Sequence, residues 1–159
     1  MLKLSKNIKM VISDFDGVFT DGSVYFDEKL NQQKRMNFSD IMGVSILIKK
    51  GIKFAIVSCE NTNILNYFKE KFGIEDIYGL IRKKGEIVEE ILKKYNLKKD
   101  EVLYIGDDIN DIPAFELVQY RVAPNNANPL IKMMDNMQIT DSKGGEGAFR
   151  EMVDSLVNQ

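Results

Sequence analysis

Two residue types that carry much of enzyme chemistry are missing or nearly missing from this chain. Its 159 residues include no histidine, and Cys59 is the single cysteine. A disulfide within the chain, a zinc site built from several cysteines and a nucleophile activated by imidazole are therefore excluded. Any acid–base catalysis has to come from carboxylates, lysine or tyrosine.

Long apolar runs and an excess of positive charge are missing as well. No apolar run approaches the ~18 residues of a membrane helix, and the short run Met10–Ile12 ends at Ser13, which is too short for a signal peptide. With 22 basic and 24 acidic residues, the net charge of −2 offers no field that attracts nucleic acid or anionic lipid. We therefore expect a cytoplasmic protein with no nucleic-acid and no membrane partner.

What is present is the composition of a globular protein. Hydrophobic residues make up 44% of the chain and charged residues 29%, and we find no internal repeat, low-complexity tract or linker rich in proline and serine. The length suits one domain with a complete core. We predict a single domain over residues 1–159.

Short β-preferring segments alternate with segments of helical period. Strands are expected at residues 9–13, 53–57 and 102–105, and weaker strands near 77–78 and 120–122. Helices are expected at residues 40–50, 62–72, 85–95, 111–118, 128–134 and 146–157. The first helix would begin with Asp40 as its N-cap, and the second with Asn61 or Thr62. This alternation predicts the α/β class, with a parallel sheet covered by helices on both faces.

Residues 22–38 break the alternation. Ser23–Phe26 and Lys34–Phe38 flank a polar stretch at Asp27–Gln33. We expect a β-hairpin that projects from the first crossover.

Polar residues follow each of the three strong strands. They are Asp14 and Asp16 after the first, Ser58, Cys59 and Glu60 after the second, and Asp107, Asp108 and Asp111 after the third. In an open α/β sheet, ligands bind at the carboxyl ends of the strands. We expect these side chains to meet at one edge. An isolated aspartate at such a place usually caps a helix or forms a turn, but a group of carboxylates contributed by three strand ends argues for a shared function.

Crowded carboxylates raise one another's pKa values unless a cation lies among them. Oxygen donors without histidine or cysteine select a hard ion, and Mg²⁺ is the obvious choice because it also leaves places for phosphate oxygens. Asp14 and Asp16 are two positions apart, so one can serve as nucleophile and the other as proton donor. Gly17 permits a sharp turn beside them. The acidic edge thus predicts a phosphate ligand.

Four segments resemble, in order and spacing, the motifs of the haloacid dehalogenase superfamily of phosphotransferases. They are Asp14–Gly22, Ser58, Lys84 and Gly106–Asp111. The first segment, together with Gly144–Glu151, resembles a branch of small phosphatases that act on 3-deoxy-2-keto sugar acid phosphates. The resemblance implies a Rossmann-like core, and the segments on either side of Ser58 are too short for the cap domain of many members.

The resemblance also implies roles for the motif residues. Asp14 would attack phosphorus, and Asp16 would protonate the leaving oxygen and then activate water. Mg²⁺ would be held by Asp14, the backbone carbonyl of Asp16, and Asp107, with Asp108 and Asp111 in support. The phosphate and the rest of the substrate would be bound by Thr20, Ser58, Cys59 and Lys84, although Lys83 stays an alternative to Lys84.

The residue at position 60 departs from the resembling octulosonate phosphatases, which usually have arginine there. Glu60 is a poor neighbour for a substrate carboxylate but accepts well from sugar hydroxyls, and Lys71 would supply a positive charge. Together they resemble the branch acting on nine-carbon, sialic-acid-like keto-acid 9-phosphates, which we favour over the octulosonate 8-phosphate. The alternative is a carboxylate at a helix start and a surface lysine.

Arg150 would bind an anionic group, or simply lie on the last helix.

The hairpin at 22–38 offers an exposed edge and the aromatic residues Tyr25 and Phe26. With the resemblance, this predicts a homotetramer in which a neighbouring copy encloses each site.

A function from another class is a phosphoryl-accepting signalling domain of the receiver kind. Its acidic pair precedes the acceptor aspartate, whereas here the second acidic group follows Asp14.

Overall fold

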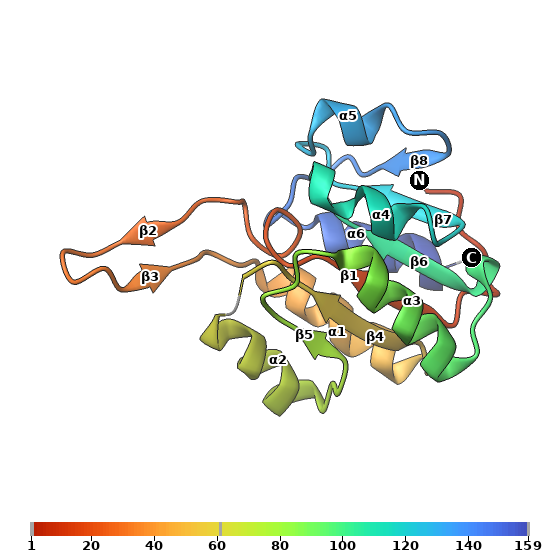
Figure 1. Ribbon diagram of the computed structural model, residues 1–159, viewed down its shortest axis with the longest axis horizontal. Coiled ribbons are helices and arrows are strands. Elements are labelled where there is room, and N and C mark those ends of the chain that lie inside the picture. Colours follow the sequence, from red (N-terminus) through yellow and green to blue (C-terminus); the bar gives the residue numbers. More distant parts are fainter. Residues whose placement is uncertain (1, 61, 159) are drawn as a thin grey trace.

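Six parallel strands form the central sheet of the computed structural model, which describes residues 2–60 and 62–158 (Figure 1). Their order across the sheet is β5-β4-β1-β6-β7-β8. The strands are β1 Met10–Ser13, β4 Lys53–Val57, β5 Ile77–Tyr78, β6 Val102–Ile105, β7 Tyr120–Ala123 and β8 Met137–Ile139. Every pair of neighbouring strands runs parallel, as the α/β prediction requires.

Alternate residues of the sheet point into two cores. On β1, Val11 joins the core beneath α1, α2 and α6, whereas Met10 and Ile12 join the core beneath α3, α4 and α5. The helices are α1 Phe38–Lys49, α2 Asn63–Phe72, α3 Lys84–Tyr95, α4 Ile112–Phe115, α5 Pro129–Lys132 and α6 Ala148–Val157, with 3₁₀ turns at Lys99–Glu101 and Ile109–Asp111. Helices on both faces confirm the predicted layers. None of the described helices is long and apolar enough to cross a bilayer.

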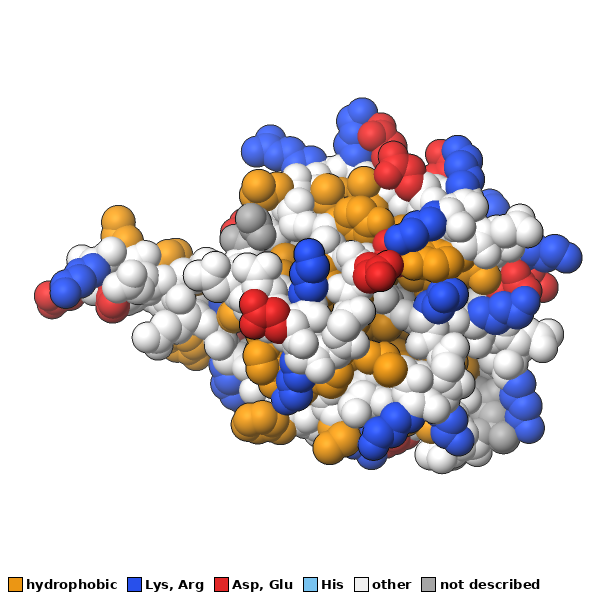
Figure 2. All heavy atoms as spheres, turned by 90° about the horizontal axis from the view of Figure 1, so that it is seen from below, with side chains coloured by type: hydrophobic (Ala, Val, Ile, Leu, Met, Phe, Trp, Pro, Cys, Tyr) orange, Lys and Arg blue, Asp and Glu red, His pale blue; other side chains and the backbone are white. Residues whose placement is uncertain are grey.

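The projecting hairpin is present, but its second strand lies earlier than predicted. The strands are β2 Tyr25–Phe26 and β3 Gln32–Gln33, and Met36 makes a separate antiparallel bridge to Thr20. Asp27 Oδ1 accepts hydrogen bonds from the backbone N–H groups of residues 29 and 31, which closes the turn within fewer residues than the polar stretch suggests. Figures 1 and 2 show the hairpin extending away from the body of the molecule.

The N-cap predicted for the first helix is wrong. Asn37, not Asp40, occupies that position, and its side chain accepts from the N–H of Ser39. Asp40 is buried in the first turn and accepts from the N–H groups of Gly147 and Arg150, so it ties α1 to α6. Sequence spacing alone does not distinguish a cap from a buried carboxylate three residues later.

Other helix and strand limits differ by a few residues. Thr62 is at the N-cap position of α2, while Asn61, the other candidate, lies outside the described residues. The helices expected at 111–118, 128–134 and 146–157 are shorter in the structure, as α4, α5 and α6. Strand β8 was not predicted, because its three half-buried residues have little apolar pattern.

Candidate active site

Asp14 lies at the point where the strand order reverses direction. From β1 the chain continues to β4 and β5 on one side of the sheet, and later to β6, β7 and β8 on the other. Ligands of open α/β sheets bind at such a point, beyond the carboxyl ends of the strands. The N–H of Asp14 donates to the carbonyl of Ile105, 2.9 Å away, so the pairing of β1 with β6 holds the residue in place.

Lys84 bridges two buried carboxylates. Its Nζ lies 2.8 Å from Asp14 Oδ2 and 2.7 Å from Asp111 Oδ1, and its side chain is 0% exposed. Burial alone would lower the pKa of Lys84, but the two carboxylates outweigh it and raise that pKa above its ordinary value. Burial, and after it the charge of Asp111, raise the pKa of Asp14 well above its usual range despite the lysine. The lysine is therefore a permanent cation beside a carboxylate that ionises reluctantly.

Asp107 completes a group of three carboxylates with Asp14 and Asp111. One oxygen of each lies within 4.8 Å of the others. Burial, followed by the charge of Asp111, raises the pKa of Asp107 to about 7. Gly17 has a φ of +77°, and a Cβ there would lie 2.0 Å from Asp107 Oδ2, so the close approach of the two loops requires glycine.

Both oxygens of Asp111 are already engaged by donors of the protein. Oδ2 accepts from the N–H groups of Asp107 and Asp108, at 3.0 and 3.2 Å. Oδ1 accepts from the hydroxyl of Tyr104 at 2.6 Å as well as from Lys84. Asp111 therefore holds the loop that carries Asp107.

The chemistry of these donors fits a hard divalent cation. Asp14 and Asp107 offer carboxylate oxygens that repel each other when both are ionised, and the group of three that they form with Asp111 offers oxygen ligands alone. Since Asp111 is saturated by protein donors, Asp14 and Asp107 are the side chains best placed to hold Mg²⁺.

Asp16 is held at both of its carboxylate oxygens. Thr20 Oγ1 donates to Oδ1 at 3.1 Å, and Lys34 Nζ contacts Oδ2 at 2.7 Å. Thr20 therefore positions Asp16 rather than facing the ligand directly. The sequence analysis missed Lys34, because a lysine on the return arm of a hairpin looks like any exposed hairpin residue.

A cavity of about 220 Å³ opens over these residues. Its lining joins the carboxylates to the turn after β4: Asp14, Asp16, Gly17, Gly22, Ser58, Cys59, Glu60, Asp107, Asp108 and Asn110. Ser58 is buried, and its Oγ accepts from the N–H of Glu60 at 3.1 Å. The structure thus brings together the predicted residues from all three strand ends.

Asn110 lies within the motif Gly106–Asp111 and also lines this cavity, but it was not predicted as a site residue. Its Nδ2 lies 3.0 Å from Cys59 Sγ, and its Oδ1 is buried with no partner among the described residues. Cys59 is half-buried at the pocket, not enclosed in a core. Asp108 is exposed and accepts from the amide of Asn128 at 2.8 Å, so it supports the loop from outside.

Three basic residues considered in the sequence analysis do not line this cavity. Lys71 is exposed in the last turn of α2 and donates to the hydroxyl of Tyr67. Arg150 pairs with Asp154 along α6, Nε to Oδ1, at 2.8 Å. Lys83 is exposed and pairs with Glu86 at 2.8 Å, so Lys84 is the lysine beside Asp14.

The glycine-rich segment before α6 packs against the turn that follows Asp14 and Asp16. Gly145 donates from its N–H to the carbonyl of Val18 at 2.9 Å. A Cβ on Gly144 would lie 1.7 Å from the carbonyl oxygen of Gly17, so no larger residue fits there without displacing the turn. The backbone of this segment therefore lies close against the turn at Gly17 and Val18.

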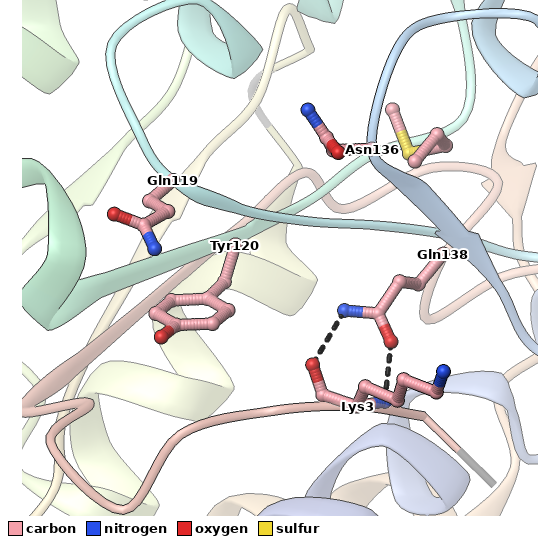
Figure 3. Close-up of a pocket in the computed structure, with 6 residues that line it drawn as sticks. Lys3, Gln119, Tyr120, Asn136 and Gln138 are labelled. Atoms are coloured by element: carbon pink, nitrogen blue, oxygen red, sulfur yellow. Dashed lines mark hydrogen bonds between the residues drawn. The ribbon is translucent and has the colours of Figure 1, made fainter.

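A larger cavity of about 510 Å³ lies elsewhere, along β8 (Figure 3). There the side-chain amide of Gln138 accepts from the N–H of Lys3 and donates to its carbonyl at 2.9 Å. These bonds tie the N-terminal segment to the edge strand of the sheet. No carboxylate lines that cavity, so it lacks the donors of the site at Asp14.

The chain is similar in sequence to known hydrolases. The family profile of haloacid dehalogenase-like hydrolases matches residues 59–152. A curated 3-deoxy-D-manno-octulosonate 8-phosphate phosphatase from Yersinia pestis is 31% identical over 157 residues, which cover 99% of this chain and 83% of that protein.

Solved structures are similar over almost the whole fold. A probable phosphatase from Pseudomonas syringae superposes with a TM-score of 0.91 at 33% identity, covering 96% of this chain and 86% of the other. A 3-deoxy-D-manno-octulosonate 8-phosphate phosphatase from Moraxella catarrhalis, solved with magnesium, phosphate and the sugar acid, has a TM-score of 0.90 at 25% identity, covering 96% and 87% of the two chains.

Proposed function

Because this chain belongs to the haloacid dehalogenase-like hydrolase family, we propose that it removes phosphate from a 3-deoxy-2-keto sugar acid by way of a phosphorylated Asp14. The observation that carries this proposal is the contact of buried Lys84 with Asp14, next to Asp16 and Asp107 in one cavity. Family and relatives make the chain a phosphoric monoester hydrolase. A receiver-like signalling domain is not supported by them.

The proposed reaction has two steps, transfer of the phosphoryl group to Asp14 and its hydrolysis. A carboxylate oxygen of Asp14 forms a bond to phosphorus while the bond to the sugar oxygen breaks, and Asp16 gives that oxygen a proton. Asp16 then takes a proton from water, whose oxygen attacks phosphorus and releases Asp14 and inorganic phosphate. Lys84 and the hydroxyl of Ser58 bind the phosphoryl oxygens, where the ammonium offsets developing negative charge.

Mg²⁺ is the cofactor that the donor set and the family indicate. Asp14 and Asp107 would hold it by their carboxylates, and Asp16 by its backbone carbonyl. When bound, the ion neutralises the phosphate charge and that of the crowded carboxylates.

The pKa values predict how metal binding varies with pH. The raised pKa values of Asp14 and Asp107 mean that the folded, metal-free protein binds more protons than the unfolded chain above about pH 4. These two groups therefore lower stability as the pH rises from about 4 through 7, and Mg²⁺ competes with their protons. We expect Mg²⁺ affinity to increase by more than about tenfold from pH 5 to pH 8.

Thermal unfolding with and without Mg²⁺ measures this effect. The metal should raise Tm far more at pH 8 than at pH 5, and Asp107→Asn should remove most of the difference. An equal rise at the two pH values would contradict the assignment.

The size of the sugar acid depends on Glu60. The curated relatives are named for the eight-carbon octulosonate 8-phosphate, which makes it a strong candidate substrate. Glu60 lines the cavity in place of the arginine expected for that substrate and favours a nine-carbon 9-phosphate. Lys71 no longer adds to this preference, because it lies at the far end of α2.

Competition between the two esters tests both the activity and the choice of substrate. With Mg²⁺ we expect phosphate release from a keto-acid phosphate, and Glu60→Arg should shift the ratio of kcat/KM towards the octulosonate ester by about tenfold. An unchanged ratio would remove Glu60 as a selector. No turnover of any phosphate ester in a broad panel would reject the proposed function.

The hairpin supports the proposal of a homotetramer. Tyr25, Phe26 and Leu30 are 56%, 63% and 78% exposed, and Figure 2 shows hydrophobic side chains along this projection. Apolar residues on an isolated two-stranded hairpin are typical of an association surface. We expect the mass in solution to be about four chains, and Phe26→Asp to lower it. A monomeric wild-type protein would contradict this.

A further inference from the structure

A second polar cavity lies next to Asp16, and the mechanism above does not use it. It measures about 320 Å³ and lies between the return strand of the hairpin and the start of α2, which are neighbours in Figure 1. Its lining residues are Asn31, Gln32, Lys34, Thr62, Asn63 and Ile64. A cavity of this size admits part of a small ligand.

Lys34 places a buried positive charge at this cavity. Its side chain is only 2% exposed, and among the described residues its ammonium contacts Asp16 alone, at 2.7 Å. An ammonium has three donors, and burial without partners is costly. Lys34 therefore has donor capacity left for an acceptor in the cavity.

Thr62 and the start of α2 provide further donors. Thr62 Oγ1 is buried and has no hydrogen-bond partner among the described residues. Thr62 occupies the N-cap position, but its side chain makes no capping bond, and the first turn of this ten-residue helix has no acidic residue. The free N–H groups and the positive end of the helix dipole favour an anion there.

The charges around the two cavities differ in sign. Five carboxylates line the cavity at Asp14, whereas no acidic residue is among those that line the cavity at Lys34. A negatively charged part of the substrate other than the phosphate is therefore better accommodated beside Lys34. Since Lys34 contacts Asp16, which protonates the leaving oxygen, this cavity lies on the leaving-group side.

We propose that the cavity formed by Lys34, Thr62 and the start of α2 binds the carboxylate of the sugar acid. This inference rests on the proposed function, since it assigns a place to the acid group of that substrate. Lys34 supplies the cation, and Thr62 donates a hydrogen bond through its hydroxyl. Because Lys34 also holds Asp16, carboxylate binding and the orientation of the proton donor are coupled.

Two variants and one control test this subsite. Thr62→Val keeps the shape and removes the hydroxyl. It should raise KM for the keto-acid phosphate and Kd for the free sugar acid by about tenfold, while its Tm stays equal or rises because an unpaired buried hydroxyl is gone. Lys34→Gln should raise both this KM and this Kd by about 100-fold. Lys34→Arg should recover part of the lost affinity. Lys69→Gln, at an exposed lysine of α2, should match the wild type.

The measurements are steady-state kinetics with the keto-acid phosphate and with p-nitrophenyl phosphate, which has no carboxylate, and calorimetric titration with the free sugar acid. Thr62→Val should lower kcat/KM for the keto-acid phosphate relative to kcat/KM for p-nitrophenyl phosphate. Wild-type KM and Kd values in Thr62→Val, or no binding of the sugar acid by the wild type, would overturn the subsite. If the wild type hydrolyses neither ester, the proposed function fails, and the sugar-acid titration alone decides the subsite.

Discussion

Replacing Asp14 by asparagine is expected to lower phosphate release by at least about 10,000-fold, because the amide cannot form the covalent bond to phosphorus. The protein should still fold. Asp14 is buried, its pKa is raised by burial, and Lys84 keeps its second carboxylate partner Asp111 in the variant. The single side-chain oxygen of asparagine can accept from the N–H of Phe15, as Asp14 Oδ1 does at 2.6 Å, or from Lys84, but not from both, so a small decrease in Tm is expected.

Two measurements accompany this prediction. Single-turnover experiments with a radiolabelled phosphate ester should label the wild-type protein transiently and leave Asp14→Asn unlabelled. In the absence of metal, the circular dichroism of Asp14→Asn should match that of the wild type, and its Tm should be only slightly lower. A variant that is folded and retains more than a few per cent of the turnover would show that another residue is the nucleophile.

The second large effect concerns the stability that Lys84 provides. Lys84→Met leaves Asp14 and Asp111 buried without their cation, and removing one partner of a buried ion pair costs about 3–5 kcal/mol. We expect a loss of this size in the free energy of unfolding at pH 8 without metal. The loss should be smaller at pH 5, because the raised pKa of Asp14 favours its protonation there and so removes one unpaired charge, and Mg²⁺ should restore part of it. Turnover should fall by about 100- to 1,000-fold.

Lys83 provides a matched control for this experiment. It is the preceding residue and also carries an ion pair, but both it and Glu86 are exposed. Lys83→Met should therefore leave Tm and kcat near the wild-type values. Equal effects of the two substitutions, measured by denaturant unfolding and by kinetics, would contradict a special place for Lys84.

Asp14 is the one carboxylate that Lys84 and Mg²⁺ would share, because Lys84 also contacts Asp111 whereas the ion would also be held by Asp107. Lys84 contacts one oxygen of Asp14 and one of Asp111. Asp111 also accepts hydrogen bonds from Tyr104 and from backbone N–H groups. Asp107 forms no ion pair with a cation of the described residues, and burial, followed by the charge of Asp111, raises its pKa to about 7. Without metal, the site is therefore most stable when one carboxylate is protonated. Because Mg²⁺ and protons compete for the same carboxylates, the stability of the site depends on pH and on the metal together.

Much of the candidate site was predictable from the order of residues along the chain. The strands before Asp14, Ser58 and Asp107 are short apolar runs, and the parallel pairing of β1 with β4 and β6 places their carboxyl ends together. That outcome needs no knowledge of individual contacts, because buried strands joined by helical crossovers form a parallel sheet whose strand ends share one edge.

The sequence by itself therefore determined the α/β architecture and the set of residues at the strand ends, because local patterns of apolar residues decide both. Only the tertiary structure decided which long side chains reach that edge. Lys34 comes from the hairpin to Asp16, whereas Lys71 and Arg150 bond to neighbours on their own helices. The physical reason is that a flexible charged side chain takes the partner that packing between distant segments brings close, and no period in the sequence records that packing.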